Sequence, residues 1–66
     1  MKITVNGETR EVDGGTTLHG LFEQMDINCE ALVVQHNDDI VARDAFAATP
    51  LADGDILELV RFVGGG

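Results

Sequence analysis

The sequence has few aromatic residues, few cations and a single cysteine, and these shortages argue against several classes of function. Its 66 residues include three phenylalanines but no tyrosine or tryptophan, so few aromatic side chains are available on which bases or sugars could stack. Four Lys and Arg stand against twelve Asp and Glu, which gives a net charge of −8. We therefore do not expect a nucleic-acid ligand, because a phosphate backbone must be neutralised by cations. The acidity fits either a basic protein partner or solubility alone.

Long apolar runs are also missing. No stretch approaches the roughly 20 apolar residues of a membrane span, and the first residues, MKITVNGE, lack the hydrophobic core of a signal peptide. The single cysteine, Cys29, excludes an internal disulfide and is typical of a reducing cytosol. We therefore expect a soluble cytoplasmic protein of one small domain. A chain of this size buries only about 60% of its unfolded surface, which leaves little room for a deep active site.

The first third of the chain predicts two antiparallel strands. Residues 2–5 alternate between polar and apolar side chains, and Asn6-Gly7 is a preferred pair for a tight hairpin turn. A second strand follows through residues 10–12, and the glycines at 14–15 end it.

The rest of the chain predicts one helix and further strands. An apolar stripe at i, i+3, i+4 and i+7 indicates a helix of about two turns, capped by a threonine at position 16 or 17. The members of the stripe are Leu18, Leu21, Phe22 and Met25. Residues 31–36 predict a strand, residues 40–42 a short edge strand, and residues 56–63 a final alternating strand with Leu57 and Leu59 on one side. This order predicts an α+β roll in which a sheet of four or five strands carries one main helix on one face.

No catalytic or metal-binding set emerges from the polar residues. His19 and His36 have no second ligand at metal-binding spacing, and the acidic residues around Cys29 oppose a reactive thiolate. The acidic pairs Asp38-Asp39 and Asp53/Asp55 lack the order of a calcium loop, so turn chemistry explains them better. We therefore expect no enzyme, no bound cofactor and no metal.

The remaining candidate is the run of glycines at positions 64, 65 and 66, which directly follows the final strand. Three glycines add nothing to a core, but they form a thin peptide that can enter a channel in a partner enzyme. Such an enzyme could activate the carboxylate of Gly66 with ATP and expose it to sulfur or to an amine. An inert terminus is the alternative. Val60 and Phe62 lie next to this tail, on the strand face that we expect to be free and to contact a partner.

The whole chain resembles the ThiS family, the bacterial sulfur carriers of thiamine biosynthesis. The resemblance rests on VNG in the first hairpin, on TL followed by L at the start of the helix, and on LADGDILELVRFVGGG at the end. It implies a ubiquitin-like β-grasp fold with a mixed sheet, formed by residues 1–63, and a flexible tail at residues 64–66. The turn in QHNDD and the strong acidity depart from the family pattern.

The resemblance also implies partners and roles. The carboxylate of Gly66 would be adenylated by an E1-like enzyme of the ThiF type, which uses ATP and Mg²⁺, and would then become a thiocarboxylate. Gly64 and Gly65 would serve tail recognition, and Val60 and Phe62 would lie on the docking face. A donor such as a cysteine desulfurase would supply the sulfur, and a thiazole synthase of the ThiG type would receive it, with the free carrier a monomer. The alternatives are a carrier like the small subunit of molybdopterin synthase, a ubiquitin-like protein modifier, and a binding module that is never conjugated.

Overall fold

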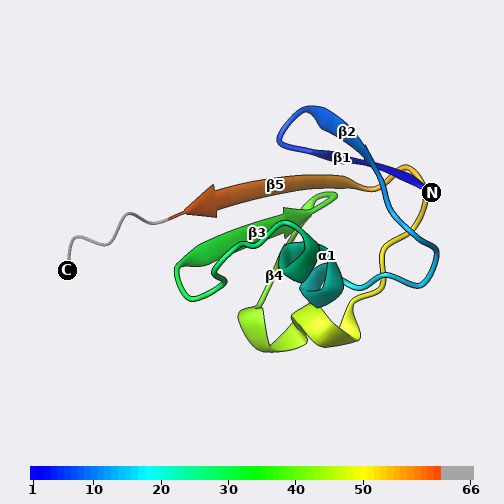
Figure 1. Ribbon diagram of the computed structural model, residues 1–66. Helices are drawn as coiled ribbons and strands as arrows, with labels where there is room; N and C mark the ends of the chain where they lie inside the picture. Colours follow the sequence, from blue (N-terminus) through cyan, green and yellow to red (C-terminus); the bar gives the residue numbers. More distant parts are fainter. Residues whose placement is uncertain (62–66) are drawn as a thin grey trace.

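The computed structural model describes residues 1–61, which form a five-stranded sheet with a helix and a 3-10 helix on one face (Figure 1). The elements in chain order are β1 (Lys2–Val5), β2 (Glu8–Glu11), α1 (Leu18–Gln24), β3 (Leu32–His36), β4 (Asp39–Val41), the 3-10 helix η1 (Arg43–Ala48) and β5 (Ile56–Arg61). The strands lie in the order β2-β1-β5-β3-β4, so β2 and β4 form the two edges. The predicted α+β roll, with its short edge strand near residues 40–42, is confirmed.

The first hairpin turns at the predicted Asn6-Gly7 pair. Both residues have positive φ, 49° at Asn6 and 83° at Gly7, which is the backbone that this pair favours in a two-residue turn. Strand β2 ends one residue earlier than expected, at Glu11. Val12 lies just beyond it, is buried, and donates its N–H to the Met1 carbonyl at 2.9 Å.

The helix α1 forms where the apolar stripe predicts it. Thr17 is the cap, and its Oγ1 accepts a hydrogen bond from the Gly20 N–H at 3.1 Å. Leu18, Leu21 and Phe22 are buried against the sheet. The stripe therefore supplies much of the core from only seven helical residues.

The 3-10 helix η1 closes the core below α1. Its residue Phe46 is 2% exposed and packs edge-on against Phe22, with ring centroids 5.2 Å apart at 76°. The core joins the helices to the inner face of the sheet, and its members are Ile3, Val5, Val12, Leu18, Leu21, Phe22, Leu32, Val34, Phe46, Leu51 and Leu57.

Strand β5 lies in the middle of the sheet. It pairs in parallel with β1, where Val5 is opposite Leu57, and in antiparallel fashion with β3, from Leu32 opposite Arg61 to His36 opposite Leu57. The sheet is therefore mixed, as the resemblance implied. Within residues 1–61, no helix is both long and apolar enough to cross a membrane.

Replacing Phe46 with alanine should lower the free energy of unfolding by about 3–5 kcal/mol, because it leaves a cavity against Phe22 in a small core. Urea denaturation followed by circular dichroism measures this loss. Ile40→Ala is the control, since Ile40 is 68% exposed, and it should cost less than about 1 kcal/mol. Equal losses in the two variants would mean that η1 does not close the core.

Candidate functional site

The side chains of β5 alternate between the core and the open face of the sheet. Leu57 is fully buried and Leu59 half-buried, and both contact the core. Ile56 and Val60 point to the face without helices and are 51% and 54% exposed. The segment that precedes the glycines is therefore packed on one side and exposed on the other.

The end of β5 is held from both neighbouring strands. On the β1 side, the Asn6 side chain continues the ladder beyond the end of that strand: its Oδ1 accepts the Leu59 N–H at 2.8 Å, and its Nδ2 donates to the Leu59 carbonyl at 3.3 Å. On the β3 side, Val60 and Arg61 are paired with Val33 and Leu32. Strand β5 is thus fixed in direction up to Arg61, the last residue that the structure describes.

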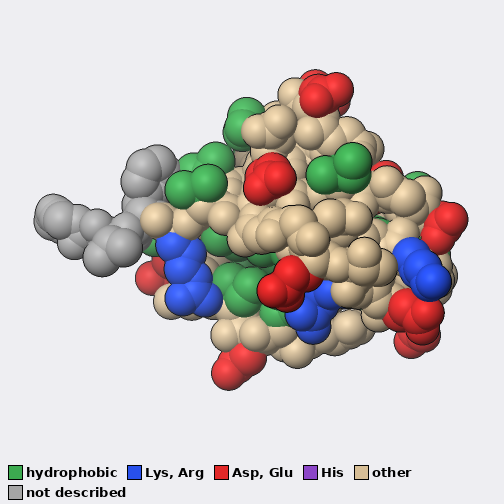
Figure 2. Space-filling model, turned by 90° about the horizontal axis from the view of Figure 1, so that it is seen from above, with side chains coloured by type: hydrophobic (Ala, Val, Ile, Leu, Met, Phe, Trp, Pro, Cys, Tyr) green, Lys and Arg blue, Asp and Glu red, His purple; other side chains and the backbone are tan. Residues whose placement is uncertain are grey.

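Apolar side chains gather on the open face of the sheet. We name this group the open-face patch, and it consists of Val33, Ile40, Ile56 and Val60. Val33 lies opposite Val60. On the same face, Gln35 lies between Ile40 on β4 and Glu58 on β5, opposite both. Figure 2, which views the molecule from above, shows the same mixture of exposed apolar and acidic side chains. Such a surface suits a partner that offers an apolar centre with a cationic or polar group for Glu58.

The residues predicted for the functional site fall into two groups. Val60 is exposed on the open face, where the alternation placed it. Phe62, Gly64, Gly65 and Gly66 lie outside the described residues, as does the expected boundary between residues 63 and 64. The docking face and the tail therefore stay predictions.

A polar network that the sequence did not indicate holds the start of β5. Asp55 is 8% exposed, and its Oδ2 lies 2.7 Å from Nε2 of His36 and accepts the Ala52 N–H at 2.8 Å. Its Oδ1 accepts a hydrogen bond from Nδ2 of Asn37 at 3.3 Å. The Asn37 Oδ1 in turn accepts the Ile56 N–H at 3.0 Å. The network therefore fastens the β3–β4 turn to β5.

The surroundings of Asp55 favour its charged form. Burial alone raises the pKa of this carboxyl, but hydrogen bonds from the Ala52 N–H, from His36 and from Asn37, together with electrostatic attraction to His36, outweigh burial and lower the pKa below its ordinary value. The QHNDD turn, which departs from the family pattern, thus supplies two partners of Asp55. Asp53 lies in the turn before β5, as expected, but its Oδ1 accepts the Lys2 N–H at 2.7 Å and so links this turn to the start of β1.

The other polar candidates form no reaction centre. His19 pairs with Glu23 on the exposed face of α1 at 2.7 Å, and Cys29 is half-buried against the core. Across residues 1–61, no three His, Cys, Asp or Glu side chains come together in a way that could hold a metal ion.

Comparison with known proteins identifies relatives along the whole chain. Residues 3–66 match the ThiS family. The sulfur carrier protein ThiS of Escherichia coli is 32% identical over 66 residues, which is 100% of both chains. The crystal structure of the thiamine biosynthesis protein ThiS from Geobacter metallireducens is similar with a TM-score of 0.84 and 36% identity, and covers 100% of both chains. The implied β-grasp fold is confirmed by this structural match.

Two further relatives are longer proteins. The thiazole synthases of Magnetococcus marinus and Paramagnetospirillum magneticum are 39% and 35% identical to this chain over 66 residues. The chain spans 20% of the length of each, so these enzymes contain a segment similar to it within a larger polypeptide.

Asp55→Asn should lower the free energy of unfolding at pH 7 by about 1–3 kcal/mol, because hydrogen-bond donors in a buried network lose their charged acceptor. A carboxylate whose pKa is lowered by folding stabilises the protein above the ordinary value of 3.8, and this stabilisation is lost as the pH falls through the lower, folded pKa. The difference between the two proteins should therefore shrink below about pH 4. Urea denaturation at a series of pH values measures it.

Asp38→Asn is the matched control, because Asp38 is an exposed carboxylate in the β3–β4 turn, next to the Asn37 that contacts Asp55. It should change the free energy of unfolding by less than about 0.5 kcal/mol. A constant difference between wild type and Asp55→Asn down to acid pH would show that the Asp55 charge does not stabilise the fold.

Proposed function

The chain belongs to the ThiS family, and from that premise we propose that it carries sulfur for thiamine biosynthesis as a thiocarboxylate on Gly66. The observation that supports this most directly is the family match, which runs through the final strand and the glycines to residue 66. The lack of a catalytic or metal-binding cluster in residues 1–61 is compatible with a carrier on which other enzymes act.

The proposed reaction takes place in two steps on the Gly66 carboxylate. An oxygen of the carboxylate attacks the α-phosphorus of ATP, which forms an acyl adenylate and releases pyrophosphate. Sulfide then attacks the carbonyl carbon and AMP leaves, which gives the thiocarboxylate and one proton. Both steps take place in the active site of an E1-like adenylating enzyme, which holds ATP and Mg²⁺. The carrier contributes the carboxylate and its own placement.

The residues before the glycines would provide that placement. Strand β5 is fixed in direction by Asn6 and by its pairing with β3. Val60 of the open-face patch would dock against the enzyme, together with Phe62, which is two residues further along the chain. Gly64, Gly65 and Gly66 would enter the channel of the enzyme. Glycine suits that path because it lacks a Cβ and tolerates extended or tightly turned backbone.

The receiving partner that we propose is a thiazole synthase. Two thiazole synthases contain a segment similar to this chain, so carrier-like and synthase sequences occur together in one polypeptide. A cysteine desulfurase is a suitable source of the sulfur, because thiols can reduce its persulfide to the sulfide used in the second step and become a disulfide. The cytoplasm, which supplies ATP and keeps thiols reduced, is a suitable compartment.

Deletion of Gly65 and Gly66 should abolish the transfer of sulfur and leave the free energy of unfolding within about 0.5 kcal/mol of wild type, because no core residue is removed. The assay incubates the chain with an adenylating enzyme of this family, ATP·Mg²⁺ and sulfide, and follows intact mass. Wild type should gain the mass difference between sulfur and oxygen, and fragmentation should place it on Gly66. No mass gain and no pyrophosphate release with wild type would refute the carrier.

Val60→Ala and Phe62→Ala should each weaken binding to the adenylating enzyme by about 1–2 kcal/mol, or roughly 5- to 30-fold, if these side chains form the docking face. Isothermal titration calorimetry measures the affinities. Thr9→Ala is a control on the edge strand β2, which β1 separates from β5, and it should bind like wild type. Unchanged binding by both variants would mean that the enzyme docks elsewhere.

A further inference from the structure

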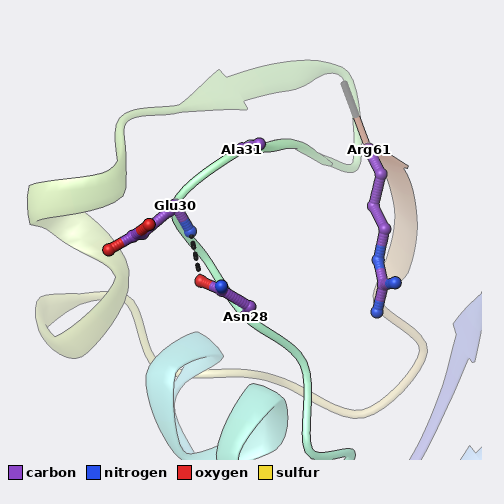
Figure 3. A pocket seen from close by; sticks show the side chains of 4 residues that line it. All are labelled: Asn28, Glu30, Ala31 and Arg61. Carbon is purple, nitrogen blue, oxygen red and sulfur yellow. Dashed lines mark hydrogen bonds between the residues drawn. The ribbon is translucent and has the colours of Figure 1, made fainter. Parts of the chain in front are cut away.

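A hollow of about 250 Å³ lies beside the end of β5 (Figure 3). Its lining residues are Asn28, Glu30, Ala31 and Arg61. Arg61 is opposite Leu32 in the β3–β5 ladder, and directly paired residues share a face of the sheet. Because Leu32 is buried under the helices, the Arg61 side chain leaves β5 on that same side and borders the hollow.

The hollow contains hydrogen-bond donors without partners in the described part of the chain. The Asn28 Oδ1 accepts the Glu30 N–H at 2.9 Å, which leaves the amide nitrogen of Asn28 available. The Arg61 guanidinium makes no ion pair with any side chain of residues 1–61, although the sequence contains twelve carboxylates. In Figure 3 the carboxylate of Glu30, which lines the same hollow, points away from Arg61. An arginine fork and an amide that border one space form a site for a carboxylate.

The charge of the whole molecule narrows the choice of ligand. At a net charge of −8, the protein repels small anions in solution, so a free phosphate or carboxylate is disfavoured. A carboxylate that belongs to a docked protein can bind in spite of this repulsion, because the other contacts of that protein hold it near Arg61. ATP is a poor candidate: if the five residues after Arg61 extend into the enzyme, they span up to about 17 Å and place the nucleotide far from this hollow.

We propose that the hollow receives an aspartate or glutamate side chain of the adenylating enzyme, bound by the fork of Arg61 and the amide of Asn28. The inference rests on the proposed function, since it requires an enzyme that takes up the tail. Val60 and Arg61 are adjacent residues on opposite faces of β5. An enzyme that contacts both residues holds the end of β5 from both faces. These contacts keep the strand from rotating about its own axis at the point where the tail begins.

The test compares the affinities of variants for the purified adenylating enzyme by isothermal titration calorimetry. Arg61→Gln should weaken binding about tenfold or more, and Arg61→Lys by less, because lysine keeps the charge but loses the fork. Asn28→Asp keeps the acceptor for the Glu30 N–H and replaces the donor with a second negative charge, so it should weaken binding as well. Arg43→Gln removes an equal charge from η1 and should bind like wild type.

Salt dependence provides a second readout. Affinity of wild type should fall as the salt concentration rises, and Arg61→Gln should show a shallower slope, because one charged pair is missing. All variants change exposed side chains and should unfold at wild-type denaturant concentrations.

The outcomes separate the two proposals. If wild type is adenylated and Arg61→Gln has the same affinity and salt slope as wild type, the acidic contact is refuted and the carrier function stands. If Arg43→Gln weakens binding as much as Arg61→Gln, the effect is one of net charge and the hollow has no specific role. If wild type neither binds the enzyme nor releases pyrophosphate, the carrier function fails, and the contact fails with it.

Discussion

The fold depends on the pairing of β5 between β1 and β3. The two hairpins, β1–β2 and β3–β4, each form locally, but within the sheet only β5 joins them. Its residue Leu57 lies at this junction, opposite both Val5 and His36, and is fully buried. Every other feature near the proposed site follows from this arrangement, because a strand paired on both sides cannot change direction without loss of the core beneath it.

Two polar groups secure the ends of that central strand. Asp55 joins the start of β5 to the β3–β4 turn, and Asn6 replaces the missing ladder bonds of β1 near the end of β5. Asn6 directly follows β1, and Asp55 directly precedes β5. Each side chain therefore accepts a hydrogen bond from a backbone N–H that no neighbouring strand pairs with. The proposed carrier thus consists of a firmly held strand followed by glycines, and the chemistry belongs to its partners.

The sequence predicted the elements with local signals and missed the contacts between distant residues. Asn6-Gly7 and the stripe from Leu18 to Met25 specify a turn and a helix by themselves, and both are confirmed. The segment RDAFAATPL has no clear period, so the sequence left either one helical turn or an irregular crossing open there. The 3-10 helix η1 forms in this segment, and Phe46 packs on Phe22. The side-chain partners of Asp55 lie 18 and 19 residues away, and no local pattern relates them.

For the candidate site, too, local patterns predicted some features and missed those that depend on distant residues. Strand alternation was enough to place Val60 on the open face, because the period of a strand is two. The second role of Asn6 and the hollow beside Arg61 require the register of β5 against its neighbours, which no local pattern contains. The family resemblance supplied the role of the glycines, and the match along residues 3–66 supports it.

The two edges of the sheet have a consequence for how copies of this protein behave at high concentration. Unpaired edge strands can recruit strands from other molecules and start aggregation. Here β2 exposes all four of its residues, three of them charged, and β4 is only three residues long, starts with Asp39 and follows Asp38 in the turn. These edges discourage strand addition between copies. The apolar side chains of the open-face patch can therefore stay exposed for a partner with little risk that the sheet will grow into a polymer.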